Sequence, residues 1–231
     1  LLSKIDDFGT PAAYNHYAVG WAHALCAPYQ WTKQVASHWG GTRNGTIVHW
    51  PNGIADAGSV RNQFHHVIDV VPTILEAAGL KAPQVVDGIK QKPIEGTSFA
   101  YTFDARNAKA PERHKTQYFE MMGQWALYDD GWLLSTKVNR APWQAFGPAN
   151  PDPLNNQVFQ LYDLNTDWNQ TADLAAKNPQ KVKEMKAQFI AGTPFMGADI
   201  AIKPGPGGNM GALVAWDGAR GCPGVQRRNG V

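Results

Sequence analysis

The fold of the second half of the chain is decided by the stretch Trp125-Ala126-Leu127-Tyr128-Asp129-Asp130-Gly131-Trp132-Leu133-Leu134-Ser135-Thr136. Two short runs of apolar and aromatic residues, 125–128 and 132–136, lie on either side of the polar triplet 129–131. An Asp-Gly pair readily adopts the left-handed backbone that tight hairpin turns require. The stretch therefore predicts two antiparallel strands joined by a short turn.

Two further strands and one helix are predicted around this hairpin. Residues 117–121 and 158–162 are short runs rich in aromatic and apolar side chains, which favour strands. A helix is expected to begin at Asn178, because Pro179 suits a first turn. The apolar residues that follow recur at helical spacing, at Val182, Met185 and Phe189. We expect a four-stranded antiparallel sheet covered by this helix.

The first half of the chain predicts a different layer. The run Thr46-Ile47-Val48-His49-Trp50 is rich in β-branched and aromatic residues, so we expect a strand that is buried on both faces. A helix is expected over 67–78, with Asp69 as its cap, Pro72 in its first turn and Gly79 as its left-handed stop. A strand followed by a loop and a helix is typical of an α/β layer.

The remaining segments carry fewer signals. Residues 14–17 (Tyr-Asn-His-Tyr) and 20–23 (Gly-Trp-Ala-His) are predicted to be ordered loops of a composition that often lines sites. After Gly192 the chain is rich in glycine and proline, so irregular or extended backbone is expected. The sequence thus predicts part of an α/β domain (1–110), a small domain of sheet and helix (111–191) and a Gly/Pro-rich tail (192–231).

Composition limits the classes of function. The chain has 231 residues, of which 43% are hydrophobic and 17% charged, as in folded globular proteins. The formal net charge is +2, which gives no basic surface for nucleic acid or for an anionic membrane. No stretch approaches the roughly 20 continuous apolar residues of a membrane span. The two cysteines, Cys26 and Cys222, are too few for a disulfide framework.

Common nucleophile and metal motifs are absent from the sequence. Ser37 and Ser98 lack the G-x-S-x-G context of a hydrolase nucleophile. The seven histidines show neither H-E-x-x-H nor another metal-ligand spacing. We therefore expect no metal site made by this chain alone.

The densest polar cluster of the sequence is the segment 31–43, Trp-Thr-Lys-Gln-Val-Ala-Ser-His-Trp-Gly-Gly-Thr-Arg. Lys33, His38 and Arg43 lie among aromatic residues, and Gly40-Gly41 permits a tight turn. Partly enclosed Lys and Arg side chains beside such a turn would suit a tetrahedral oxyanion such as sulfate or phosphate. A surface loop with solvated charges is an equally open interpretation of these residues.

Five segments follow one another in the order of a known family. They are 14–17 with 20–22, 33–43, 47–51, 66–79, and 161–164 with 173–175. Lysine, a short spacer and Gly-Gly-x-Arg, then an apolar run ending in Trp-Pro and a helix, resemble the pattern of sulfatases. Leu161-Tyr162-Asp163-Leu164 is similar to the closing L-Y-D-L motif of that family, and the first segment looks like a loop of one arylsulfatase subgroup. The resemblance covers roughly residues 1–190.

The resemblance implies a fold and a chemistry. The family has an alkaline-phosphatase-like α/β domain, followed by a smaller domain with a four-stranded antiparallel sheet and a helix. It hydrolyses sulfate esters with a formylglycine made from Cys or Ser, beside a divalent cation that is usually calcium. By position, Lys33 matches the family's lysine that contacts the sulfate oxygens. His23, His38 and Arg43 are candidates for the substrate-side loop, with Arg43 expected to support it through an ion pair.

The nucleophile motif and the cation ligands of the family are not found in the sequence. The motif is Cys or Ser, any residue, Pro or Ser, any residue, Arg, whereas Cys26-Ala27-Pro28-Tyr29-Gln30 ends in glutamine and lies well after the nucleophile's usual place. We therefore expect that Cys26 is not the nucleophile and that this chain alone binds neither calcium nor formylglycine. The missing parts are expected before Leu1, in a longer protein.

Three hypotheses about function remain open. The chain is the C-terminal portion of an arylsulfatase and inactive alone, or a non-catalytic sulfatase-like binding or structural module, or a relative that transfers phosphoryl groups. Apolar residues around Ile74 and Leu75 would be uncovered, so we expect the chain to need a partner, either its own N-terminal part or another copy. The full-length enzyme would act on a small aryl sulfate. Location is left open, although the family is often periplasmic or secreted.

Overall fold

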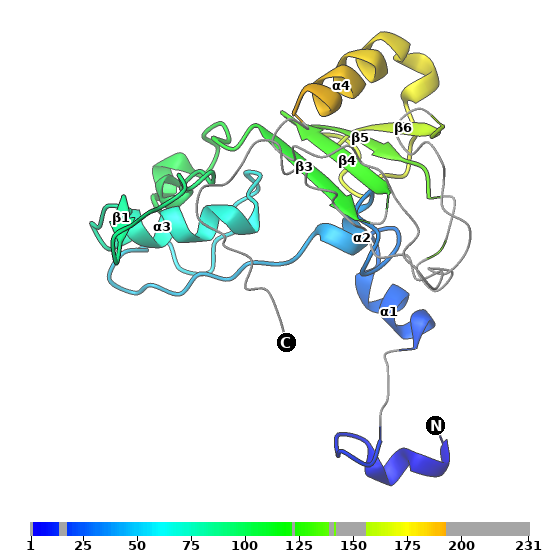
Figure 1. Ribbon diagram of the computed structural model, residues 1–231, viewed down its shortest axis with the longest axis horizontal. Coiled ribbons are helices and arrows are strands. Elements are labelled where there is room, and N and C mark those ends of the chain that lie inside the picture. The colour runs from blue at the N-terminus through cyan, green and yellow to red at the C-terminus, as the bar shows by residue number, and fades with distance from the viewer. Residues whose placement is uncertain (1, 14–17, 122, 139–140, 142–155, 193–231) are drawn as a thin grey trace, which may run out of the picture. The chain divides into compact units, whose positions relative to one another are not determined.

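The computed structural model describes residues 2–13, 18–121, 123–138, 141 and 156–192 (Figure 1). The predicted loop at 14–17, the tail after Gly192 and Cys222 therefore lie outside the described residues. The chain forms two compact units. The first comprises Leu1–Arg43, Tyr118–Leu127 and Gly131–Val231, and the second comprises Asn44–Gln117 and Tyr128–Asp130.

A four-stranded antiparallel sheet has the order β3-β4-β5-β6. Its strands are β3 (Thr116–Met121), β4 (Gln124–Asp129), β5 (Trp132–Thr136) and β6 (Phe159–Asp163). In the pairing of β5 with β6, Trp132 lies opposite Asp163 and Thr136 opposite Phe159. The turn between β4 and β5 has left-handed backbone at Asp130 (φ 45°) and Gly131 (φ 87°). The predicted strands and hairpin are confirmed.

The helix α4 (Pro179–Gly192) packs on one face of this sheet (Figure 1). Met185 and Phe189 are fully buried against strand residues that form the core with them, namely Trp125, Leu127, Leu134 and Leu161. The ring of Phe189 stacks on that of Trp125, with 3.5 Å between the ring centroids. Burying a large apolar side chain of this kind contributes about 1.5–3 kcal/mol each. The helix predicted after Asn178 is confirmed.

Residues 20–23 form a helix, and the prediction of a loop there is wrong. They belong to α1 (Val19–Cys26), and none of the eight residues of α1 is buried. The helix therefore rests on local propensity, because Ala22, Ala24 and Leu25 are strong helix formers that offset the cost of Gly20. The sequence pattern missed it because a helix without a buried face shows no apolar periodicity.

The second unit is built around α3 (Val70–Ala77), which continues a 3-10 turn at Val67–Asp69. Asp69 directly precedes α3, Pro72 lies in its first turn, and Gly79 follows with left-handed backbone (φ 66°). Pro72 and Gly79 lie where the sequence predicts, whereas the prediction that Asp69 caps the helix is wrong, because its side chain accepts no hydrogen bond from the first turn of α3. The solvent-facing side is apolar, with Ile74 60% exposed, which agrees with the expectation of uncovered apolar surface there.

The carboxylate of Asp69 holds the second unit together. It is completely buried and accepts hydrogen bonds from the backbone N–H groups of His66 (2.8 Å) and Thr97 (2.7 Å). Its Oδ2 also lies within hydrogen-bond distance of Nδ1 of His114, at 2.7 Å, while Nε2 of His114 lies 3.1 Å from the carbonyl oxygen of Thr116. One carboxylate thus joins the start of α3 to two distant segments.

The segment 46–50 forms no strand, so the prediction of a strand buried on both faces is wrong. Ile47 is 95% exposed, and Val48 and Trp50 are exposed too. A strand needs a neighbour for its backbone N–H and C=O groups. Within the described part of the chain, the short strands β1 (Val85–Val86) and β2 (Ile89–Lys90) pair with each other and β3 to β6 pair among themselves. The segment has β-forming residues but no strand beside it.

Of the residues described, no helix combines the length and the apolar character that crossing a membrane requires. Their architecture is mixed α/β, with the antiparallel sheet as its largest element.

Replacing Asp69 with alanine is expected to destabilise the protein by about 3–5 kcal/mol, because it leaves the buried His114 and two backbone N–H groups without their acceptor. Urea unfolding followed by circular dichroism measures the loss. The exposed carboxylate of Glu95 is the control, since Glu95→Ala should change the free energy of unfolding by less than about 0.5 kcal/mol. Equal midpoints for both variants would contradict the central role of Asp69.

Candidate functional site

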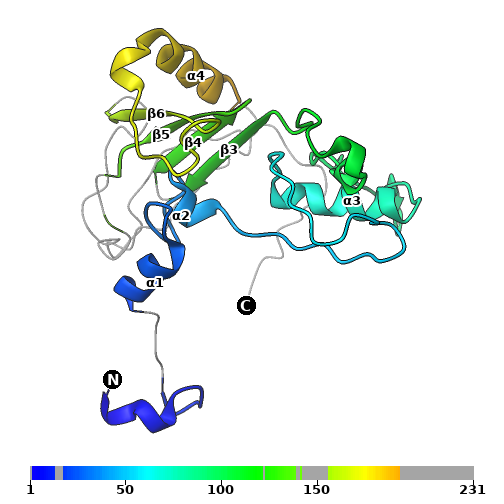
Figure 2. The same ribbon diagram turned by 180° about the vertical axis from the view of Figure 1, so that it is seen from behind.

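The predicted anion-binding segment covers the face of the sheet that lies away from α4. Figure 2 shows α4 and α2 (Trp39–Thr42) on opposite sides of the sheet. The ring of Trp39 meets that of Phe119 edge-on at 5.8 Å, and the ring of His38 meets that of Tyr162 at 6.4 Å. Val35 to Trp39 are all buried. The segment is therefore a packed part of the first unit rather than a free surface loop.

Two glycines allow this segment to fold tightly. The backbone N–H of Gly40 donates to the carbonyl oxygen of Gln30 at 3.0 Å. A Cβ atom on Gly40 would overlap the carbonyl oxygens of Gln30 and Trp31, and one on Gly41 would overlap the carbonyl oxygen of Val35. Gly40 and Gly41 form part of the short helix α2 rather than a separate tight turn, and glycine is required there because backbone carbonyl groups approach so closely.

Gln170, which the sequence did not single out, fastens the segment to the loop after β6. Its side-chain Oε1 accepts the backbone N–H of Trp39 at 2.7 Å, and its Nε2 lies 3.5 Å from the carbonyl oxygen of Ser37. Its own carbonyl oxygen accepts a hydrogen bond from Nε2 of Gln30. Gln170 is fully buried. No sequence signal marks it, because its partners lie 131 to 140 positions away in the chain.

Lys33 is exposed to solvent. Two of its neighbours, Trp31 (φ 66°) and Gln34 (φ 77°), have left-handed backbone. Left-handed backbone costs a residue with a side chain roughly 1–2 kcal/mol, so contacts elsewhere must maintain it. The ammonium group of Lys33 is thus carried on a strained and well-anchored backbone, with its charge free to face solvent or a ligand.

His38 is buried, in contrast to Lys33. Its Nδ1 lies 2.8 Å from Oγ of Ser37, and both side chains are almost inaccessible to solvent. Burial lowers the pKa of His38 from 6.5 to about 4, although a hydrogen bond with Gln160 opposes this shift. A neutral, enclosed imidazole supports the packing of the segment and does not reach a ligand at the surface.

His23 and Arg43, the other two candidates, are exposed. His23 lies on α1, outside the packed segment. The guanidinium carbon of Arg43 lies 5.1 Å from the centre of the Tyr29 ring, and Tyr29 in turn meets Trp168 edge-on at 5.6 Å. The contact seen for Arg43 is therefore a cation–π contact.

The residues described here do not fit the cation and the nucleophile of sulfatases. They include no group of three His, Cys, Asp or Glu side chains that could hold a metal ion. Cys26 is a partly buried free thiol at the end of α1. Four positions after it, where the nucleophile motif requires arginine, the sequence has Gln30.

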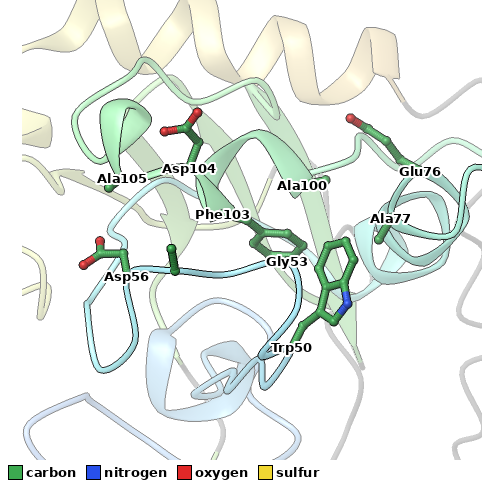
Figure 3. A pocket seen from close by; sticks show the side chains of 10 residues that line it. Trp50, Gly53, Asp56, Glu76, Ala77, Ala100, Phe103, Asp104 and Ala105 are labelled. Carbon is green, nitrogen blue, oxygen red and sulfur yellow. The ribbon is translucent and has the colours of Figure 1, made fainter.

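A separate hollow lies within the second unit and is acidic (Figure 3). Trp50 and Phe103 meet edge-on at 6.0 Å in it, and Asp56, Glu76 and Asp104 contribute carboxylates. A hydrogen bond with Arg106 lowers the pKa of Asp104 to about 2, so this carboxylate is charged at neutral pH. Asp56 forms an ion pair with Arg61 at 2.7 Å and Asp104 forms one with Arg106 at 2.5 Å, so arginines offset two of the three charges.

The stability of the protein is expected to fall between pH 6.5 and about 4 because of His38. Its pKa is lower in the folded state than in the unfolded state, so the unfolded chain binds the proton first as the pH falls. The expected loss for this group is about 3 kcal/mol over that window. Burial lowers the pKa of His65 and His66 too, so their contribution has the same sign.

The measurement compares urea unfolding of the wild type and of His38→Gln at pH 7 and pH 4.5. The free energy of unfolding should depend less on pH in the variant, and His23→Gln, at an exposed position, serves as the control with the wild-type dependence. An unchanged pH dependence in His38→Gln would refute the assignment.

Solved structures are similar to this chain over part of their length. The crystal structure of Ps i-CgsB, and that of Ps i-CgsB in complex with k-i-k-neocarrahexaose, each match with 20% sequence identity and a TM-score of 0.51, covering 72% of this chain and 32% of the solved chain. BT33336S-sulf of Bacteroides thetaiotaomicron, described with the metabolism of multiple glycosaminoglycans, matches with 17% identity and a TM-score of 0.49, covering 69% of this chain and 31% of its own.

At these identities the similarity concerns the fold alone, and this chain spans about a third of the length of the solved chains that it matches. A family of known proteins matches a segment that includes the last turn of α1, Lys33, Gly40-Gly41 and α3. Over residues 23–80, the chain matches the model of the sulfatase family.

Proposed function

We propose that the chain is the C-terminal portion of an arylsulfatase, in which Lys33 contacts the sulfate group of the bound ester. The observation that carries this proposal is the place of Lys33, which is exposed on a strained and anchored backbone inside the segment that matches the sulfatase family. Strained backbone of this kind gathers at functional sites. Of the two interpretations of the segment 31–43, an anion site and a surface loop with solvated charges, these observations favour the anion site.

The chemistry of a sulfate ester gives Lys33 its role. When the ester bond breaks, negative charge develops on the departing aryl oxygen and on the sulfuryl oxygens. A fixed ammonium group stabilises this charge more in the transition state than in the ground state, which accelerates the reaction. Arg43, whose guanidinium lies over the ring of Tyr29, supports the same segment from its far end.

We propose that the nucleophile and the cation are supplied by other residues of the whole enzyme. Residues 1–110 would then be the last part of its α/β domain, and 111–191 its small C-terminal domain. The uncovered side chains of Ile47 and Ile74 support this arrangement, since their apolar surface calls for a covering partner. Either the N-terminal part of the same protein or another copy would supply the cover.

The ester itself has a second candidate. One solved structure similar in fold is in complex with k-i-k-neocarrahexaose. A sulfate ester of a carbohydrate is therefore an alternative to an aryl sulfate, with the same role for Lys33. A non-catalytic sulfatase-like binding or structural module is the other alternative.

The test is made on the whole encoded protein with 4-nitrophenyl sulfate, a sulfated oligosaccharide and 4-nitrophenyl phosphate. Lys33→Ala should lower kcat for the sulfate ester by about 10²- to 10³-fold, the range seen when one charge-stabilising group is removed. Lys81→Ala changes an exposed lysine outside the segment and should leave kcat as it is.

The outcomes separate the hypotheses. Hydrolysis of the phosphate ester alone would show that the protein is a phosphatase and not a sulfatase. No hydrolysis of any of the three esters would favour the non-catalytic module. Full activity of Lys33→Ala would exclude Lys33 from the site while leaving the sulfatase activity in place.

A further inference from the structure

We infer that Gln170 is a positioning residue for Lys33. It holds Lys33 in place through hydrogen bonds to residues before and after Lys33 in the chain. The inference rests on the proposed contact of Lys33 with the sulfate group. It adds a residue from the C-terminal domain that no sequence motif marks.

The contacts of Gln170 enclose Lys33 on both sides. Three positions before Lys33, the side chain of Gln30 donates to the carbonyl oxygen of Gln170. Four and six positions after Lys33, the carbonyl of Ser37 and the N–H of Trp39 meet the side-chain amide of Gln170. One residue thus fixes the ends of the stretch whose centre carries the ammonium group.

The burial of Gln170 shows that this arrangement is specific. Glutamine is rarely buried completely, and a buried amide without partners is costly. Gln170 has partners at Oε1, at Nε2 and at its carbonyl oxygen, and its own backbone is left-handed (φ 61°).

The left-handed backbone on both sides of Lys33 explains why the hydrogen bonds of Gln170 are needed. Trp31 and Gln34 are both left-handed, a conformation that relaxes when nothing maintains it. The link through Tyr29 and Trp168 supports the segment before Gln30, but it does not touch the flank after Lys33. The packing of His38 and Trp39 on the sheet and the hydrogen bond from Gly40 to Gln30 hold the segment as well. Loss of Gln170 removes hydrogen bonds on both sides of Lys33 and is expected to loosen the backbone that carries it, and a displacement of about 1 Å costs roughly 10²-fold in rate.

The first experiment follows hydrogen exchange of the backbone amides in the full chain. In Gln170→Ala, amides in 31–42 should exchange about tenfold faster or more, while those of Leu133 and Leu134 in the sheet keep their wild-type rates. Gln30→Ala removes only one contact and serves as the milder variant if Gln170→Ala does not fold. Gln180→Ala, in the exposed part of α4, is the matched control.

The second experiment is a double-mutant cycle on kcat for 4-nitrophenyl sulfate in the whole encoded protein. Gln170→Ala should lower kcat by about tenfold or more when Lys33 is present, and should have little effect in the Lys33→Ala background. A general loss of stability would lower kcat equally in both backgrounds.

The results distinguish the two proposals. Fast exchange confined to 31–42, with non-additive kinetics, supports the positioning role. Wild-type exchange in 31–42, uniformly faster exchange, or additive kinetics overturns it. If Lys33→Ala is fully active, the proposed role of Lys33 fails, while the exchange data still decide whether Gln170 holds the segment.

Discussion

A sheet whose two faces both carry large side chains must be covered on both, and in this protein two segments far apart in the sequence do so. On one face the rings of Trp125 and Phe189 stack at 3.5 Å, which fixes α4. On the other face the ring of Phe119 meets that of Trp39, and the ring of Tyr162 meets that of His38. The covering of this second face places the candidate site, because the residues that pack inward leave Lys33 pointing outward.

The elements that the sequence predicts correctly are those whose signals are local. The Asp130-Gly131 turn, the helix after Pro179 and the helix before Gly79 each depend on residues within a few positions of one another. The segment 46–50 shows the limit of this reasoning. Its residues favour a strand, but a strand exists only beside another, and the described residues provide none there.

The residues of the candidate site also differ in whether the sequence could predict them. Lys33 and Gly40-Gly41 are found from a motif, and the structure gives the glycines a steric reason. The inward direction of His38 could not be predicted, because a histidine in a polar cluster looks the same whether it faces solvent or the core. Gln170 lies between the two parts of the family-like segment, 161–164 and 173–175, but its role is beyond sequence reasoning because its partners lie in a remote part of the chain.

The distance along the chain between the segment and its anchor also orders the events of folding. Gln170 lies 131 positions after Trp39, so a ribosome adding about 5–20 residues per second makes the anchor roughly ten seconds after the segment. Until then, nothing in the chain can hold the left-handed backbone at Trp31 and Gln34 through these hydrogen bonds. Contacts between distant residues form slowly because the intervening loop must first close. The part of the molecule best suited to bind an anion is therefore expected to be among the last to acquire its shape.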